Sequence, residues 1–305
     1  MVLVVLIWSV NYTVAKIGFH TMRPLALASF RVSIAGLVML PVAIWCAIRR
    51  RREEAAGQTS RMKRIGVGDL WNFACLGFFG IFLNQGIFTV GLSMTSVGRS
   101  AIVVATTPVF ILLAAWTQGL ERLTVRKVLG LAVAFAGAVV LGAGRNWDLH
   151  STGSRGDLLT FVACLSVVIF TVLGKRMAKS YDALQLMAYN VTLAGLFALP
   201  IATWQAWSMI RTGEWGAIGW QGWAAAAYMG ILSSALCIPL YFWVLRWLPP
   251  SKIGALSYLQ PVVGTPFAAL VLGEPMTGDL LSGGVLILAG VYAIESDRSL
   301  NEETS

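Results

Sequence analysis

The stretch GLVMLPVAIW, residues 36–45, returns later in the chain as GLFALPIATW, residues 195–204. Both copies are apolar, and each has Gly, Leu, Pro and Trp at the same steps. The match continues toward the N-terminus at a constant offset, where Lys16 pairs with Lys175. Self-similarity of this kind indicates a duplicated structural unit.

A second series of matches runs through the end of each half of the chain. The pairs are Pro108 with Pro261, Glu121 with Glu274, Thr124 with Thr277, and Gly130 with Gly283. We therefore predict two copies of one unit, residues 1–145 and residues 146–296, followed by a polar tail at residues 297–305.

The composition excludes a water-soluble globular protein. Of the 305 residues, 57% are hydrophobic and 12% are charged, and the mean hydropathy is +0.74, whereas soluble domains carry about 25% charged residues. Such a small number of charged side chains cannot cover the surface of a protein of this size in water. The surrounding solvent is therefore a lipid bilayer. The net charge of +9 then indicates attraction to anionic lipid headgroups and not to nucleic acid, which would need a basic face on a soluble body.

Apolar stretches that are long enough for helices indicate how often the chain crosses the bilayer, whose hydrocarbon core needs about 20 helical residues. The predicted spans are residues 2–19, 25–48, 70–92, 100–119, 125–143, 157–174, 182–206, 221–245, 252–272 and 279–294. These stretches are too long for barrel strands and lack their alternating pattern. The predicted fold class is all-α integral membrane, with ten transmembrane helices and five in each copy.

Basic residues predict the orientation of the spans, because Lys and Arg of short loops stay on the cytoplasmic side. If both termini are cytoplasmic, that face collects most of the 23 Lys and Arg residues, including the run from Arg49 to Arg64. The opposite loops collect Arg23, Arg99, Arg145, Arg155 and Arg211. We therefore predict that both termini lie in the cytoplasm.

An odd number of spans in each copy means that the second copy enters the membrane from the opposite side. Such inverted repeats have two mirror-like states, each open to one face, around a shared site near the midplane. This arrangement favours a carrier. A lipid-modifying membrane enzyme and a non-transporting scaffold are the alternatives, although the clustered carboxylates or nucleophile–base pair of an enzyme are not visible in the sequence.

Several motifs resemble one transporter family. They are WSVNYTVAK from Trp8 to Lys16, the Phe30–Arg31 pair, and the Pro, Glu, Thr and Gly arrangement that occurs once around ERLT and once around EPMT. Over nearly the whole chain they resemble the EamA-type carriers of the drug/metabolite transporter superfamily. The resemblance implies a ten-helix exporter in a bacterial inner membrane that moves amino acids or related small metabolites outward. Because the superfamily also includes drug-efflux, nucleotide-sugar and triose-phosphate carriers, the substrate stays open.

Polar side chains inside the predicted spans are few, and each is costly to bury without a partner or a wet cavity. Amide, hydroxyl and guanidinium groups suit the recognition of a polar substrate. The candidates for substrate binding are Asn11, Tyr12, Arg31, Asn84, Gln85, Thr107, Tyr241, Ser257, Tyr258 and Gln260. The structural alternative is that the hydroxyl groups bond to their own helix or to a neighbour.

Two cations fall inside predicted spans. We expect Lys16 to snorkel toward the outer headgroups. Arg31 lies deeper, where a fixed positive charge would attract a carboxylate or phosphate of the substrate. All 14 acidic residues fall in loops or at span ends, which leaves no carboxylate at mid-span for a proton relay.

Two prolines are expected to control the conformation of the cavity. Pro108 and Pro261 each remove an amide donor inside a predicted span and free the carbonyl group of Val104 or Ser257. We predict a bend at each proline. Free backbone at membrane depth either packs against neighbouring helices or lines a wet chamber.

Glu121 and Glu274 precede the fifth and tenth predicted spans, where a negative charge favours the start of a helix. We interpret them as a structural latch, with a gate as the alternative. Small residues in the two following spans predict close helix packing or a homodimer surface. The four cysteines lie in apolar stretches without a metal-ligand spacing, so neither a metal nor a cofactor is expected.

Overall fold

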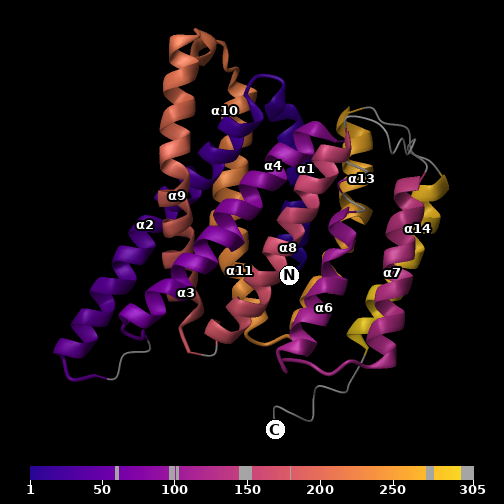
Figure 1. Ribbon diagram of the computed structural model, residues 1–305, viewed down its shortest axis with the longest axis horizontal. Coiled ribbons are helices and arrows are strands. Elements are labelled where there is room, and N and C mark those ends of the chain that lie inside the picture. The colour runs from indigo at the N-terminus through magenta and orange to yellow at the C-terminus, as the bar shows by residue number, and fades with distance from the viewer. Residues whose placement is uncertain are drawn as a thin grey trace.

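The structure, a computed structural model, describes residues 1–58, 62–95, 100, 103–143, 153–178, 180–272 and 278–296. Over these residues every regular element is a helix, which confirms an all-helical architecture for this part of the chain (Figure 1). The elements are α1 (Val2–Phe19), α2 (Pro24–Ala55), α3 (Val67–Gly77), the π-helix η1 (Phe78–Leu83), α4 (Asn84–Met94), α6 (Thr107–Thr117), α7 (Val125–Ala143), α8 (Gly153–Ala178), α9 (Ala183–Arg211), the 3₁₀-helix η2 (Glu214–Ala217), α10 (Trp220–Ala227), the π-helix η3 (Tyr228–Leu236), α11 (Cys237–Leu245), α12 (Pro250–Leu256), α13 (Leu259–Leu272) and α14 (Gly278–Glu295).

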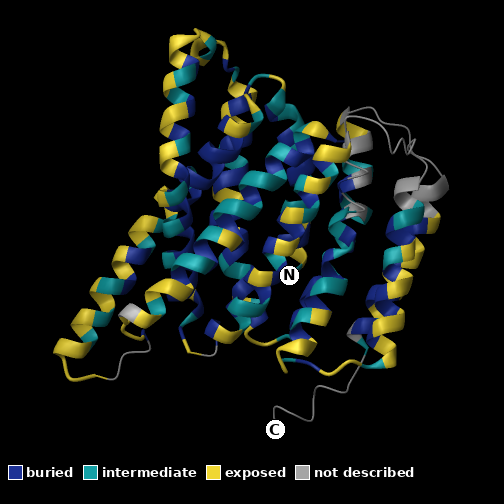
Figure 2. Ribbon diagram, viewed as in Figure 1, coloured by how far each residue is buried: buried dark blue, intermediate teal, exposed yellow. Residues whose placement is uncertain are grey.

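Six of the helical stretches are long and apolar enough to cross a membrane. They are Val2–Phe19, Pro24–Ala55, Gly68–Met94, Ser154–Ala178, Ala183–Arg211 and Trp220–Leu245, and shorter apolar helices cover Val103–Thr117 and Ser282–Ile294. Exposed positions recur along these helices (Figure 2), and many of them carry large apolar side chains: Leu37 is 62% exposed and its counterpart in the repeat, Leu196, is 58% exposed. Apolar surface of this kind is stable when the surrounding solvent is lipid.

A π-helical segment interrupts one long helix in each half of the chain. α3, η1 and α4 follow one another without a gap, and so do α10, η3 and α11. Inside η3, the Ser234 hydroxyl donates to the Met229 carbonyl at 2.8 Å and so occupies a backbone acceptor of the widened turn. π-helical segments are frequent at functional sites because they shift the side chains that follow them around the helix.

The helices that contain the two predicted bends stop before their prolines. Pro108 lies in the first turn of α6, where its missing amide costs no helical hydrogen bond. The preceding turn is closed by the Thr106 amide, which donates to the Val103 carbonyl at 3.1 Å. In the second half the Ser257 amide donates to the Gly254 carbonyl at 2.9 Å, and the chain turns between α12 and α13. Each predicted bend is therefore a break one to four residues before the proline, which leaves the proline in the first turn of the next helix, where its missing amide costs no helical hydrogen bond.

Equivalent helices of the two halves pack against each other. α2 crosses α9 where Gly36 meets Gly195, and a Cβ atom at Gly36 would lie only 2.6 Å from the Gly195 Cα atom. α7 lies along α14 at one edge of the bundle (Figure 1), and a Cβ atom at Gly137 would lie 2.7 Å from the Gly283 carbonyl oxygen. The close packing expected from small residues in these helices is therefore present.

Lysines of equivalent position cap one helix in each half. Lys16 Nζ donates to the carbonyl groups of Leu92 and Thr95, both at 2.9 Å, at the C-terminal end of α4. Lys175 Nζ donates to the carbonyl groups of Leu245 at 2.6 Å and Leu248 at 2.9 Å, at the end of α11. Snorkelling of Lys16 to the headgroups stays a prediction, and the structure adds a role that it did not include, because Lys16 supplies a donor to the unpaired carbonyl groups at a helix C-terminus.

Candidate substrate-binding cavity

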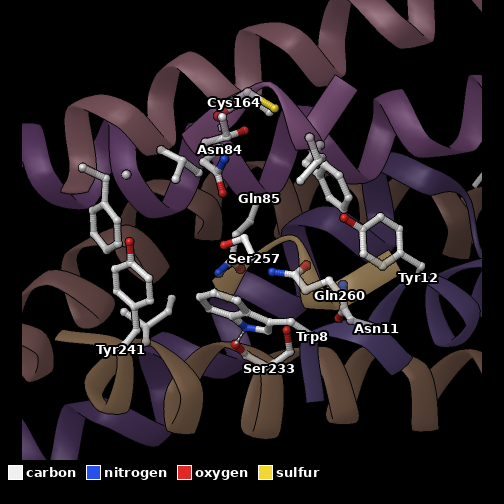
Figure 3. A pocket seen from close by; sticks show the side chains of 18 of the residues that line it. Trp8, Asn11, Tyr12, Asn84, Gln85, Cys164, Ser233, Tyr241, Ser257 and Gln260 are labelled. Atoms are coloured by element: carbon white, nitrogen blue, oxygen red, sulfur yellow. Dashed lines mark hydrogen bonds between the residues drawn. The ribbon is translucent and has the colours of Figure 1, made fainter. Parts of the chain in front are cut away.

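A cavity of about 150 Å³ lies among α1, α2, η1, α4, α6, α8, η3, α11 and the turn between α12 and α13. All the predicted binding residues except Tyr258 line it, namely Asn11, Tyr12, Arg31, Asn84, Gln85, Thr107, Tyr241, Ser257 and Gln260. In Figure 3, Asn84 and Gln85 enter from one side, and Trp8, Asn11 and Gln260 enter from the opposite side. Residues that are far apart in the sequence thus share one polar chamber.

Tyr258 does not line the cavity. It is 1% exposed and packs in an apolar cluster with Ala134 of α7 and Ile287 of α14. One residue along a helical turn rotates the side chain by about 100°. Ser257 therefore faces the cavity, while Tyr258 faces the α7–α14 pair.

The break before each proline brings backbone to the cavity. Val104, just before the turn at Thr106, lines the cavity, and Ser257 lines it at the turn between α12 and α13. Pro108 itself is buried beside this chamber and is not among the lining residues. Pro261 lies in the first turn of α13. Val104 and Ser257 therefore line the cavity, but the Ser257 carbonyl is not free as predicted, because it accepts from the Gln260 amide at 3.0 Å.

Amide groups supply much of the polar lining. Asn84 Nδ2 donates to the Ala163 carbonyl at 2.7 Å, and Gln85 Oε1 lies 2.8 Å from the Ser234 hydroxyl, where it competes with the Met229 carbonyl for the single hydroxyl proton. Within the described ranges, Asn11 Oδ1 and Thr107 Oγ1 are buried and have no hydrogen-bond partner. Buried polar atoms in this state are available to a ligand, since an unmet hydrogen bond costs about 1–3 kcal/mol.

Arg31 brings a positive charge to the cavity from α2. Its side chain contacts neutral hydroxyl groups: Nη1 donates to Thr89 Oγ1 at 3.3 Å, and Nη2 donates to the hydroxyl groups of Ser233 and Ser234 at 3.4 Å. These distances are long for N–H···O bonds, which centre near 2.9–3.0 Å. Arg31 is 3% exposed, and its Nε–H has no partner among the residues that the structure describes.

Aromatic rings form an apolar wall of the cavity. The Trp8 and Tyr241 rings lie 5.6 Å apart, and Tyr12 meets the edge of Phe88 at 5.5 Å. The Trp8 indole donates to the Ser233 carbonyl at 2.9 Å, which fixes its ring across the cavity (Figure 3). This combination of aromatic wall and few placed polar groups is typical of small-molecule sites.

Sequence reasoning missed an apolar part of the lining. α8 contributes Ala163, Cys164 and Phe170, and α11 contributes Ile238. The α8 residues resemble other apolar helix residues in sequence and carry no distinguishing signal. Ile238 did carry a signal in the sequence, because it occupies the position in the second half that corresponds to Gln85 in the first half.

Glu121 lies away from the cavity, in a buried ion pair. Its carboxylate accepts from Lys127 Nζ at 2.9 Å, and both side chains are 0% exposed. The same carboxylate accepts from the amide of Ser251 at 2.8 Å and from the Ser251 hydroxyl. The contacts tie the segment after α6 to the first turn of α12, as expected for a latch. Glu274 lies outside the described residues.

Known proteins resemble this chain over nearly its whole length. The model of the EamA-like transporter family matches residues 1–143 and again residues 154–296. An uncharacterized transporter of Bacillus subtilis, YoaV, is 24% identical over 95% of this chain and 93% of its own length. A probable amino-acid metabolite efflux pump of Escherichia coli is 27% identical over 95% of this chain and 91% of its own length.

A solved crystal structure of a protein shares this fold with a TM-score of 0.66 at 20% identity, over 95% of this chain and 93% of the other. Since the family model matches both halves, the chain belongs to the EamA-like transporter family, whose members here are membrane transporters and not enzymes.

Proposed function

We propose that this protein exports a small polar metabolite, such as an amino acid or an amino-acid derivative, across a bacterial cytoplasmic membrane by alternating access. Two five-helix repeats, residues 1–145 and 146–296, would be inverted and would enclose one substrate site. The observation that carries this proposal is the central cavity, to which both halves contribute polar side chains.

Matched features of the two halves support the inverted repeat. The Lys16 and Lys175 caps, the two π-helical segments and the breaks before two prolines occupy corresponding positions. The contact of Gly36 with Gly195 joins one residue to its own counterpart, as expected near a twofold axis between repeats. Two such units can rock about the contact and expose the shared site to each face in turn.

The distribution of basic residues supports an orientation with both termini in the cytoplasm. On this orientation, the basic run from Arg49 to Arg64, which begins in the last turns of α2, and the latch around Glu121 lie on the cytoplasmic face, whereas the Lys16 cap lies on the outer face. The name of the Escherichia coli relative supports outward transport of an amino-acid metabolite. Drug efflux is the alternative within the same class.

Counterflow in proteoliposomes tests the proposal. Vesicles that contain the full chain are loaded with an unlabelled mixture of amino acids and N-acyl amino acids, and uptake of each labelled solute is measured against protein-free vesicles. We expect at least one solute to accumulate transiently. The absence of protein-dependent counterflow for every solute would overturn the transporter assignment.

A matched pair of variants links transport to the cavity. Val104→Phe places a larger side chain into the lining, whereas Val128→Phe makes the same change on α7, where Val128 is 48% exposed. We expect Val104→Phe to reduce counterflow at least tenfold at equal incorporation and Val128→Phe to leave it nearly unchanged, because a filled cavity excludes the substrate. Equal effects of both variants would contradict this location for the site.

A further inference from the structure

The charge of the cavity is unbalanced in the part of the chain that the structure describes. Arg31 is the charged residue among the lining side chains, and none of these side chains is acidic. Ion pairs between described residues lie elsewhere, as in Lys127 with Glu121. Since arginine side chains stay protonated in proteins, Arg31 gives the cavity lining one positive charge.

Burial makes this unbalanced charge costly. Arg31 is 3% exposed in a helix that is long and apolar enough to cross the membrane, and its partners are hydroxyl groups at 3.3–3.4 Å. An ionisable group at such depth is stabilised by an opposite charge or by water. A guanidinium with an unused Nε–H offers a carboxylate a charge-assisted hydrogen bond, which neutral hydroxyl groups cannot match.

The rest of the cavity lining suits a substrate whose remaining groups are uncharged. Asn11 Oδ1 and Thr107 Oγ1 are buried and have no partner among the described residues, so they can accept hydrogen bonds from neutral N–H or O–H groups. Trp8, Tyr12 and Phe88 present aromatic surface to an apolar or planar group. The ammonium of a zwitterionic amino acid would find no carboxylate among the described lining residues.

We infer that the transported species is a small organic monoanion whose carboxylate binds Arg31 and whose neutral polar and aromatic parts lie against the remaining lining. The inference rests on the proposed transport function and deepens it, because it gives the substrate a charge. A singly charged carboxylate balances Arg31, whereas a phosphate monoester carries about −1.5 to −2 at neutral pH and would leave excess negative charge.

A net anion also supplies a driving force for export. Outward movement of one negative charge is favoured by an inside-negative membrane potential, by about 2.3 kcal/mol per 100 mV. Such a carrier needs no proton relay, which agrees with the absence of acidic residues from the described cavity lining. The predicted transport cycle is therefore electrogenic.

Three probes with one aromatic body and different charges test the inference. Proteoliposomes of the full chain are loaded with labelled N-acetylphenylalanine, a monoanion, or phenylalanine, a zwitterion, or phenylalaninamide, a cation. Potassium gradients with valinomycin set the potential, and protein-free vesicles measure passive leakage. We expect N-acetylphenylalanine to leave fastest and to leave faster when the interior is negative.

Substitutions of Arg31 connect the charge effect to this residue. We expect Arg31→Gln to reduce N-acetylphenylalanine efflux about tenfold or more at equal incorporation, since a hydrogen bond to a charged group contributes about 1.5–3 kcal/mol. Arg31→Lys should recover part of the efflux. The control Arg176→Gln removes an exposed cation from α8 and should leave efflux unchanged. Equal efflux of Arg31→Gln and wild-type protein would overturn the inference.

The outcomes separate this inference from the proposed function. Potential-independent efflux of phenylalanine alone would overturn the anion inference and leave the transporter standing. Counterflow of other solutes without efflux of any of the three probes would likewise overturn the anion inference and leave the transporter assignment standing. The absence of all protein-dependent movement would overturn both.

Discussion

The two halves of the chain differ in charge at one pair of corresponding residues near the cavity. Arg31 in α2 corresponds to Asn190 in α9. Arg31 lines the cavity, whereas Asn190 is 0% exposed and its Nδ2 donates to the Leu186 carbonyl of its own helix at 2.6 Å. The repeats thus share the framework of lysine caps and glycine contacts, while the charge at the cavity comes from one repeat alone.

A second difference lies at the latch and gives the largest expected effect. Glu121 has Lys127 as its partner, but the residue that corresponds to Lys127 in the second half is Leu280. We expect Lys127→Leu, which gives the first half the sequence of the second, to lower the free energy of unfolding by about 3–5 kcal/mol, because it leaves a buried carboxylate without its cation. Thermal unfolding in detergent measures the change.

Two further variants sharpen this comparison. Adding Glu121→Gln to Lys127→Leu should restore much of the melting temperature, since the amide buries no charge. Arg49→Leu removes the exposed pair with Glu53 and should cost less than about 1 kcal/mol. If Lys127→Leu proves as mild as Arg49→Leu, the latch does not hold the two segments together.

Exchanging Arg31 and Asn190 tests whether the two repeats are equivalent at the cavity. We expect Arg31→Asn to reduce N-acetylphenylalanine efflux about tenfold or more, through loss of a charge-assisted hydrogen bond. Adding Asn190→Arg should not restore it, because position 190 is buried away from the lining residues. The efflux assay compares the two variants at equal incorporation. Recovery in the double variant would show that either repeat can supply the charge.

These differences also explain what could be predicted from the sequence. The cost of burying polar groups in lipid identified Asn84, Gln85 and Gln260 as cavity residues, because a polar side chain inside a membrane span must face either a partner or a wet cavity. It failed for Tyr258, since hydropathy does not fix how a side chain is rotated after a helix break. It also did not foresee the cap that Lys16 forms, because its acceptors lie in another helix far along the chain. Tertiary contacts decide both positions.

The lysine caps should respond alike in the two halves. We expect Lys16→Met and Lys175→Met each to lower the free energy of unfolding by about 1–2 kcal/mol, because each leaves carbonyl groups at a helix C-terminus without a cationic donor. Thermal unfolding of the two variants, beside the exposed control Arg176→Met, measures this. A loss confined to Lys175→Met would mean that Lys16 reaches the headgroups after all.

The smallest effect concerns the residues before α2 and α9, whose charges are reversed. Arg23 pairs with Glu214 near the start of α2, whereas its counterpart Asp182 accepts from the Leu184 and Gln185 amides and caps α9. The hydrogen bond from Arg23 holds the pKa of the Glu214 carboxyl below its usual value. A lowered folded-state pKa stabilises the fold at pH values above the unfolded-state pKa, and this contribution disappears as the pH falls through the folded-state pKa.

The melting temperature of the wild-type protein should therefore fall slightly more than that of Arg23→Gln when the pH falls from 7 through the acidic range. Because both side chains are exposed, salt should reduce the difference, and parallel melting curves of the two proteins would show that the pair contributes nothing.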